Sequence, residues 1–189
     1  MKPVVVGVLL AAGAGTRMGG PKALVMDGGG VPWVVRSVDV LRSGGCTEVA
    51  VVVGAAGDEV AELLVDQGVS IVPSLEWSTG MGASLRSGLT WASTTKAEAA
   101  LVHLVDLPDV GADVVRRVLA SAAGPDGLAR ASYEGRAGHP VLIGRAHFGG
   151  AKAAAVGDRG AGHYLRGAGC VLVPCDDLAH GNDQDHPQA

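Results

Sequence analysis

The sequence predicts an α/β fold: a single-domain, Rossmann-like three-layer sandwich with a mostly parallel sheet. Three observations predict it. Short apolar runs rich in valine alternate with stretches of helical periodicity, and the first run breaks at once into a glycine-rich loop. The chain has 189 residues, enough for one domain with a substantial core and too few for two.

The apolar runs are expected to form the strands. The first, from Val4 to Leu10, is apolar without alternation, which is typical of a strand buried on both faces of a parallel sheet. Further short runs bounded by Gly, Pro or Asp have the same character. They lie at 49–53, 69–72, 100–105, 128–133, 141–143 and 171–173.

Helices are expected between the strands, where apolar residues recur at helical spacing. They are predicted at 32–42, 58–66, 111–121 and 163–166, and the segment 78–92 is predicted to be a loop followed by a helix. Such alternation places helices on both faces of a sheet, and ligands then bind outside the carboxyl ends of the strands. The loop after the first strand, the loop before the third helix and Asp106 should therefore share one edge.

Composition limits the function classes. The net charge of −4 argues against a general nucleic-acid binder, which carries a basic excess or stripe. The apolar start resembles a secretory signal but leads directly into Arg17 and Lys22, so a strand followed by a loop accounts for it better. No segment has the ~20 consecutive apolar residues of a membrane helix. The three cysteines form no Cys-x-x-Cys pair, which is typical of small buried residues in a reducing cytoplasm.

The loop after the first strand combines glycines with two cations. Glycine tolerates positive φ and leaves its N–H accessible, and successive N–H groups in such a turn form an anion-binding nest. Arg17 and Lys22 add full positive charges, and a guanidinium can bind two oxygens at once. The sequence therefore predicts a polyphosphate site here. The glycines are Gly13, Gly15, Gly19 and Gly20.

Two standard phosphate loops do not fit this segment. A P-loop has a hydroxyl residue after its lysine, whereas Ala23 follows Lys22 and Pro21 precedes it. A dinucleotide fingerprint has a third glycine where this chain has Met18. The alternative is a glycine-rich surface turn that binds nothing, and two cations in one short loop argue against it.

A third pattern does fit. The run Leu-Ala-Ala-Gly-x-x-x-Arg-Met-Gly-x-x-Lys, which ends at Lys22, closely resembles the signature of the MobA-like nucleotidyltransferases, which attach a nucleotide to molybdopterin. Segments 77–88, 106–108, 138–142 and 157–161 resemble other parts of that family. The Leu-Ala-Ala-Gly form is more like its cytidylyl-transferring branch. The resemblance implies the nucleotide-diphospho-sugar transferase type of fold, with residues 1–110 binding the nucleotide and 111–189 on the acceptor side.

The resemblance also implies a reaction governed by charge. CMP would pass from CTP to a phosphorylated acceptor such as molybdopterin, with release of pyrophosphate. A phosphate nucleophile is already anionic, so positioning and charge neutralisation replace a Ser-His-Asp arrangement. Arg17 is expected on the β- and γ-phosphates and Lys22 over the α-phosphate. The expected nucleotide-binding residues are Leu10, Ala11, Ala12, Gly13, Gly15, Gly80 and Ser84.

Mg²⁺ is the cofactor that the resemblance implies. Asp106 follows an apolar run and precedes Pro108, so its carboxylate should emerge at the end of a central strand, where one or two carboxylates suit Mg²⁺. A helix cap or turn aspartate is the alternative. The acidic C-terminal motif of the family aligns Asp183 and Asp185 with its metal ligands, although the helix that follows it in relatives is missing here. A polar, frayed tail is the alternative for this segment.

The acceptor side is expected at His139 and Arg86, with a structural histidine as the alternative for His139, and Arg159 is expected on the solvated surface. The implied partners are a nucleoside triphosphate and a small phosphorylated acceptor, with transient contact to a molybdoenzyme or its chaperone. Neither nucleic acid nor a membrane is expected as a partner.

Three other activities stay open. The acceptor could be a sugar phosphate or another cofactor precursor, which the first loop does not distinguish. Some proteins that resemble this family are named NAD(P)H-dependent oxidoreductases that act on a nicotine-derived pigment, and the incomplete dinucleotide fingerprint argues against that activity. A catalytically inactive binding module with the same fold is the third.

Overall fold

The valine-rich run near the start of the chain forms the middle of the sheet. In the computed structural model, which describes residues 3–122 and 124–184, β1 (Val5–Leu10) is buried along its whole length. It pairs in parallel with β2 (Glu48–Val53) on one side and with β4 (Ala99–Leu104) on the other. A strand flanked on both edges and covered on both faces has no polar side, which explains the unbroken apolar run.

Around β1, the described residues form a seven-stranded sheet in the order β3-β2-β1-β4-β6-β5-β7. Its outer strands are β3 (Ser70–Pro73) and β7 (Val171–Pro174), and β5 (Leu128–Tyr133) lies next to β7. The strand β6 (Arg136–Gly144) runs antiparallel to both of its neighbours, whereas the other pairings are parallel. The prediction of a mostly parallel sheet is confirmed.

The antiparallel strand is longer than the sequence predicts. Its first half, before the predicted run at 141–143, carries Arg136, Gly138 and His139 and has no apolar pattern. A tight turn creates the hairpin with β5, because Glu134 and Gly135 both adopt positive φ, at 51° and 73°. Two successive residues of this kind match the twist of a two-residue hairpin loop.

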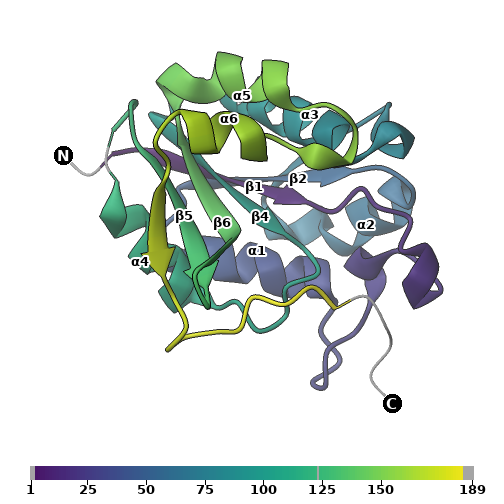
Figure 1. Ribbon diagram of the computed structural model, residues 1–189. Coiled ribbons are helices and arrows are strands. Elements are labelled where there is room, and N and C mark those ends of the chain that lie inside the picture. The colour runs from purple at the N-terminus through teal and green to yellow at the C-terminus, as the bar shows by residue number, and fades with distance from the viewer. Residues whose placement is uncertain (1–2, 123, 185–189) are drawn as a thin grey trace.

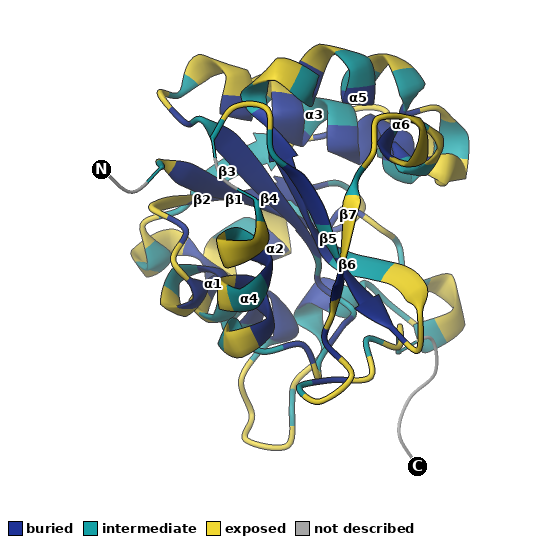
Figure 2. Ribbon diagram, turned by 60° about the vertical axis from the view of Figure 1, so that its left-hand side comes forward, coloured by how far each residue is buried: buried dark blue, intermediate teal, exposed yellow. Residues whose placement is uncertain are grey.

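Helices cover both faces of the sheet in three layers (Figure 1). One face carries α1 (Trp33–Gly44), α2 (Gly57–Leu63) and α4 (Ala112–Ser121). The other carries α3 (Met81–Thr94), α5 (Phe148–Ala154) and α6 (Gly162–Gly167). Figure 2 shows each helix turning its buried side to the sheet and its exposed side to solvent. Among the described helices, none combines the length and apolar character that crossing a bilayer requires.

Helix α5 does not follow from the sequence pattern. It contains Gly149 and Gly150, and glycine disfavours a helix by about 1 kcal/mol relative to alanine. Packing requires the second of them, because a Cβ at Gly150 would lie 2.3 Å from Cε2 of Tyr164. Helix α2 also differs from its prediction: it ends at Leu63, and a short 3-10 turn, η3 (Val65–Gln67), follows.

The sheet brings the loops of interest to one edge. Leu10 at the end of β1 pairs with Leu104 at the end of β4, so the loops after these parallel strands leave the sheet side by side. The N–H of Val105 also donates to the carbonyl of Leu10. The predicted juxtaposition of the glycine-rich loop and Asp106 is thus a direct consequence of strand register.

Candidate active site

The glycine-rich loop is shaped by two residues with positive φ. Gly15 (φ 59°) and Gly19 (φ 81°) flank a short 3-10 turn, η1 (Thr16–Met18), which carries Arg17. A Cβ at Gly15 would lie 1.9 Å from the carbonyl oxygen of Gly20, so the loop closes on itself only with glycine there. A second 3-10 turn, η2 (Lys22–Leu24), then presents Lys22.

The start of this loop is held by neighbouring strands. The N–H of Ala11 donates to the carbonyl of Val52, and the carbonyl of Ala12 accepts from the N–H of Ala55. Within the part of the chain that the structure describes, the N–H groups of Gly13, Ala14 and Gly15 have no acceptor. Backbone donors without protein partners beside two cations provide the elements of an anion site.

The loop borders a cavity of about 690 Å³, called the first cavity below. Its volume lies within the range of small-molecule sites. It brings together the nucleotide-binding, cationic and metal-ligating residues that the sequence singles out within the described part of the chain. These are Leu10, Ala11, Ala12, Gly13, Gly15, Arg17, Lys22, Gly80, Ser84, Asp106 and Asp183.

A close ion pair crosses the first cavity. Nζ of Lys22 lies 2.7 Å from Oδ2 of Asp106, and the two side chains are only 15% and 20% exposed. The two residues are 84 positions apart in the chain, so the contact depends on the parallel pairing of β1 with β4. Oδ2 of Asp106 therefore already has a cation beside it in this structure.

Two further carboxylates line the first cavity: Asp183 from the C-terminal segment and Asp158 from the 3-10 turn η6 (Gly157–Arg159). Across residues 3–122 and 124–184, no group of three or more His, Cys, Asp or Glu side chains is arranged to hold a metal ion. Mg²⁺ commonly takes only one or two protein carboxylates and completes its shell with water and phosphate oxygens. The carboxylates of Asp106 and Asp183 match this coordination preference. Asp185, the other expected ligand, lies outside the described residues.

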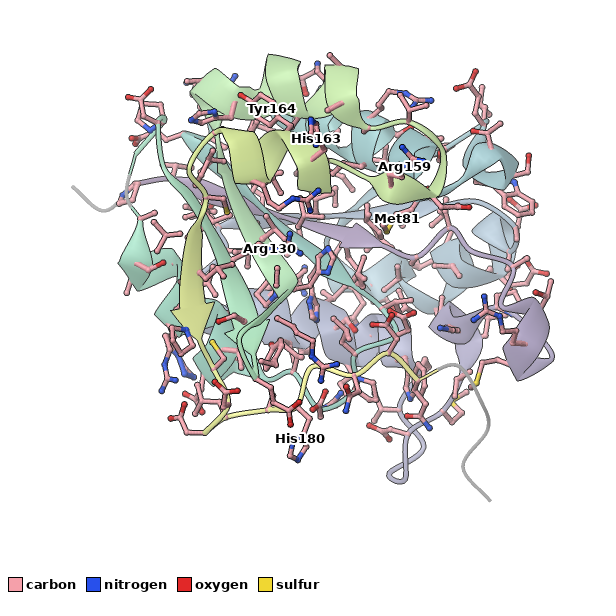
Figure 3. All side chains as sticks on the ribbon, viewed as in Figure 1. Met81, Arg130, Arg159, His163, Tyr164 and His180 are labelled. Carbon is pink, nitrogen blue, oxygen red and sulfur yellow. The ribbon has the colours of Figure 1, made fainter. Side chains whose placement is uncertain are left out.

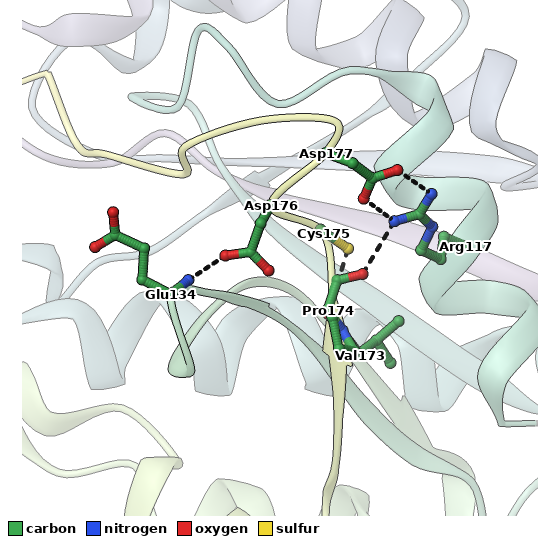
Figure 4. Close-up of polar contacts among 7 residues, drawn as sticks. All are labelled: Arg117, Glu134, Val173, Pro174, Cys175, Asp176 and Asp177. Carbon is green, nitrogen blue, oxygen red and sulfur yellow. Dashed lines mark hydrogen bonds and ion pairs between the residues drawn. The ribbon is translucent and has the colours of Figure 1, made fainter.

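The C-terminal segment reaches the first cavity as a strap, defined here as residues 175–184. Its start is attached to β5 and α4 (Figure 4). The N–H of Cys175 donates to the carbonyl of Ser132, and the carboxylate of Asp176 accepts from the N–H of Glu134. Asp177 binds Arg117 through both carboxylate oxygens, and this hydrogen bond from the guanidinium lowers the pKa of Asp177. Residues 181–184, the described part of the segment for which a frayed tail is the alternative, are held as well, by the contacts that follow.

The rest of the strap is held by the loop after β4. Oδ2 of Asp109 accepts from the N–H groups of His180 and Gly181, at 2.7 and 3.0 Å. The N–H of Gln184 donates to the carbonyl of Asp106 at 3.0 Å, which places Asp183 beside the Asp106 loop. Gly181 has φ 64°, and a Cβ there would lie 2.1 Å from the ring of Tyr133, so the path of the strap requires glycine.

A second cavity, of about 150 Å³, adjoins the first. Leu10 and Met81 line both cavities and so form the wall between them. His139 lines the second cavity, together with Arg130 from β5 and Arg159 from η6. Figure 3 shows Arg130 on the sheet below α6 in the view, with Met81 and Arg159 farther to the right, whereas His180 on the strap points away from the molecule.

The histidine of the second cavity is neutral near pH 7. Burial lowers the pKa of His139 to about 3, and the positive charge of Arg130 and the neighbouring His103 act in the same direction. Its imidazole can therefore donate one hydrogen bond and accept another. Arg86, the other residue expected at the acceptor, lines neither cavity. Its guanidinium donates to the carbonyl of Ala155 and pairs with Glu76, so it ties α3 to nearby loops.

Sequence reasoning missed three residues that line these cavities. Arg130 lies in a strand whose apolar pattern conceals it. Arg159 is exposed, as expected, but it also lines the second cavity. Asp158 lies in a segment expected on the acceptor side, yet it lines the first cavity. This acceptor-side segment reaches the first cavity because η6 packs against the loop before α3. A Cβ at Gly80 would lie 2.5 Å from the carbonyl carbon of Gly157. Nothing in the sequence pattern indicates this packing.

Comparisons with known proteins agree on one family. The sequence profile of the MobA-like NTP transferase domain matches residues 7–176. Nicotine blue oxidoreductase of Paenarthrobacter nicotinovorans is 36% identical over 97% of this chain and 93% of its own length. Molybdenum cofactor guanylyltransferase of Rhodobacter capsulatus is 38% identical over 62% of this chain and 59% of its own.

A solved structure extends the agreement to the whole fold. The crystal structure of a homologue of Mycobacterium tuberculosis Rv0371c, from Mycobacterium sp. strain JC1, superimposes with a TM-score of 0.80 at 28% identity. The match covers 98% of this chain and 92% of that one.

Proposed function

The chain belongs to the MobA-like NTP transferase family and is a nucleotidyltransferase of that kind, and on this premise we propose that it transfers CMP from CTP to a small phosphorylated acceptor. Molybdopterin is the acceptor we propose. The observation that carries the proposal is the meeting of Arg17, Lys22 and Asp106 in one cavity at the carboxyl edge of the sheet. This arrangement suits a triphosphate and a cation that neutralises it.

The donor would bind along the glycine-rich loop. The N–H groups of Gly13, Ala14 and Gly15 provide donors for phosphate oxygens, while Arg17 would bind the β- and γ-phosphates and Lys22 the α-phosphate. The backbone at the end of β1 would contact the base. Gly80 and Ser84 would border the donor from α3, where Ser84 is 5% exposed and lines the first cavity.

The metal would lie at the opposite wall. Asp106 and Asp183 would hold Mg²⁺, and Asp185 is proposed with them on the family motif alone. The ammonium of Lys22 beside Oδ2 of Asp106 supports a cation position at that oxygen. When bound, Mg²⁺ would neutralise charge on the phosphates.

The chemistry itself needs no protein nucleophile. A phosphate oxygen of the acceptor would attack the α-phosphorus of CTP, the new O–P bond would form, and the bond to the β-phosphate would break, releasing pyrophosphate. Lys22 and Arg17 would stabilise the charge that develops on the transferring and leaving groups. The acceptor would extend past Met81 into the second cavity, where His139 is the proposed contact.

Pyrophosphate release from each of the four nucleoside triphosphates, with molybdopterin and Mg²⁺ present, tests this proposal. CTP should give the fastest release, and omission of acceptor or metal should abolish it. Equal turnover with all four triphosphates would remove the CTP assignment, and no release with any of them would remove the transferase proposal as a whole.

One relative favours a second candidate activity. The match to nicotine blue oxidoreductase covers 97% of the chain at 36% identity. We therefore also propose NAD(P)H-dependent reduction of a planar, nicotine-derived pigment as the activity to test against the first. Thermal stabilisation separates the two, since a ligand that binds only the folded state raises the melting temperature, and the rise grows with the logarithm of ligand concentration over Kd. CTP with Mg²⁺ should stabilise a transferase, and NADH or NADPH a reductase.

A further inference from the structure

The first cavity has an aromatic wall to which the proposed phosphate and metal sites assign no role. Trp77 supplies this wall from the 3-10 turn η4 (Trp77–Thr79), which follows β3. The chain contains three Trp, two Tyr and one Phe, and within its described part only Trp77 of these lines the first cavity. The indole is partly exposed, so a ligand in the cavity can contact it.

A glycine lets the indole approach the start of the glycine-rich loop. Gly54 directly follows β2, and a Cβ there would lie 2.6 Å from Cγ of Trp77 and 2.6 Å from the carbonyl oxygen of Ala12. The indole and the Ala12 carbonyl therefore meet over bare backbone at the end of β2. A larger residue at position 54 would displace one of them, so Gly54 fixes the wall beside the end of β1.

The strand order separates this wall from the cation and metal side of the cavity. β1 lies between β2 and β4, and Lys22 meets Asp106 beyond the end of β4. The start of the glycine-rich loop is instead bonded to the β2 side, through the N–H of Ala11 and the carbonyl of Ala12. A triphosphate held at Lys22 would thus direct its nucleoside back along the loop, toward Trp77.

An aromatic wall at that end suits a nucleobase. A base is planar, carries no charge at neutral pH and has a π-face, so it gains from covering an indole that water otherwise contacts, whereas a phosphate does not. Removal of an aromatic side chain that stacks on a base weakens nucleic-acid binding by roughly 5- to 140-fold per base. Stacking holds the face of the base and leaves its edge to the backbone at the end of β1.

We propose that the base of the donor nucleotide stacks on Trp77, and that Gly54 is the positioning residue that lets the indole reach it. This inference rests on the proposed function and deepens it, since it names the side chain that binds the base. The indole supplies affinity for the nucleoside end of CTP, and Arg17 and Lys22 supply affinity for its phosphates.

Binding of CTP and of inorganic tripolyphosphate, each with Mg²⁺, distinguishes the base contact from the phosphate contacts. In isothermal titration of the full chain, Trp77→Leu should weaken CTP binding at least about tenfold and leave tripolyphosphate binding unchanged. Trp77→Phe keeps an aromatic face and should weaken CTP binding less than about threefold. Trp91→Leu is the matched control, since Trp91 is half-buried on α3 and lines neither cavity, and it should change neither affinity.

Three results would overturn the stacking. The first is unchanged CTP affinity in Trp77→Leu. The second is an equal loss for CTP and tripolyphosphate, because the indole would then only support the loop. The third is an equal loss of CTP affinity in Trp77→Leu and Trp77→Phe. In the transferase assay, Trp77→Leu should raise the KM for CTP about tenfold with kcat within about twofold, because the base contact is present before and during the reaction.

Fluorescence detects the contact without removing Trp77, and so also covers a Trp77→Leu variant that does not fold. Trp33→Phe combined with Trp91→Phe leaves Trp77 as the sole tryptophan. CTP with Mg²⁺ should protect its emission from quenching by acrylamide, whereas tripolyphosphate should not. Equal quenching with and without saturating CTP would contradict the proposal. If the double variant does not fold, the wild type compared with Trp77→Phe gives the same information.

The wild type separates this inference from the proposed function. CTP binding that neither depends on Trp77 nor protects it overturns the stacking alone. If neither CTP nor tripolyphosphate binds the wild type in the presence of Mg²⁺, the proposed function itself is overturned.

Discussion

The ammonium of Lys22 lies 2.7 Å from the carboxylate of Asp106 and connects the loop after β1 to the end of β4. Both side chains are largely buried, and an unpaired charge in such a place is costly. Each residue therefore helps to hold the other at the first cavity. Bound phosphates and Mg²⁺ would offer each of them an alternative partner of the same charge type, so ligand binding need not leave either charge unpaired.

Removing the ammonium tests this arrangement directly. Lys22→Ala should lower the rate of pyrophosphate release at least about 100-fold, because loss of one preorganised donor to the transferring group has an effect of that size. The far-UV circular dichroism spectrum should remain that of the wild type. Lys152→Ala on α5 is the control, since Lys152 lines neither cavity, and it should retain activity. A wild-type rate in Lys22→Ala would rule out its assigned role.

The loop conformation can be tested at Gly15. Gly15→Ala should abolish nucleotide stabilisation in a thermal melt, because its Cβ would meet the carbonyl of Gly20 at 1.9 Å and its φ of 59° is unfavourable for alanine. Gly20→Ala is the matched control, since a Cβ there has open space and no positive φ is required. If both variants bind CTP equally well, the loop geometry does not control donor binding.

The strap should control metal affinity through Asp109. Asp109→Ala removes the acceptor for the N–H groups of His180 and Gly181, so Asp183 should be held less firmly. The Mg²⁺ concentration for half-maximal pyrophosphate release should rise about tenfold, while the free energy of unfolding should change by only about 1 kcal/mol. Asp113→Ala, which removes an exposed carboxylate paired with Arg116, should show neither effect. An unchanged metal requirement in Asp109→Ala would contradict the positioning role of the strap.

The free energy of unfolding should decrease as the pH is lowered, because of His103. Burial lowers the pKa of this histidine to about 4 from an ordinary value of 6.5, with Arg36 contributing, and its Nδ1 has no hydrogen-bond partner among the described residues. Between these values the unfolded chain binds the proton and the folded chain does not. The stabilisation is therefore present above pH 6.5 and is lost as pH falls toward 4, by about 1–3 kcal/mol.

Urea unfolding at pH 7, 5.5 and 4.5 measures this effect. His103→Gln should reduce the dependence on pH, and His139, whose pKa burial also lowers, should account for the remainder. His163→Gln, at an exposed position on α6, should leave the dependence as in the wild type. A pH dependence that is the same in His103→Gln and the wild type would show that other groups cause it.

Local sequence patterns predict the N-terminal part of the sheet and the glycine-rich side of the first cavity. The unbroken apolar run before Leu10, the glycines with Arg17 and Lys22, and Asp106 at the end of the next central strand are local patterns. Local patterns suffice where a strand is buried on both faces and the loop after it contains the glycines and cations of the site. Parallel pairing then brings Lys22 and Asp106 together without any further information.

The C-terminal part depends on tertiary contacts instead. Helix α5 contains two glycines, of which Gly150 lies against the ring of Tyr164, and the strap follows its path because Asp109, Arg117 and Ser132 hold it. The second cavity exists only because β5, β6 and α6 converge on the far side of Met81. These features depend on contacts between residues far apart in the chain, which periodicity cannot encode. A cation such as Arg130 looks the same in the sequence whether it faces water or a cavity.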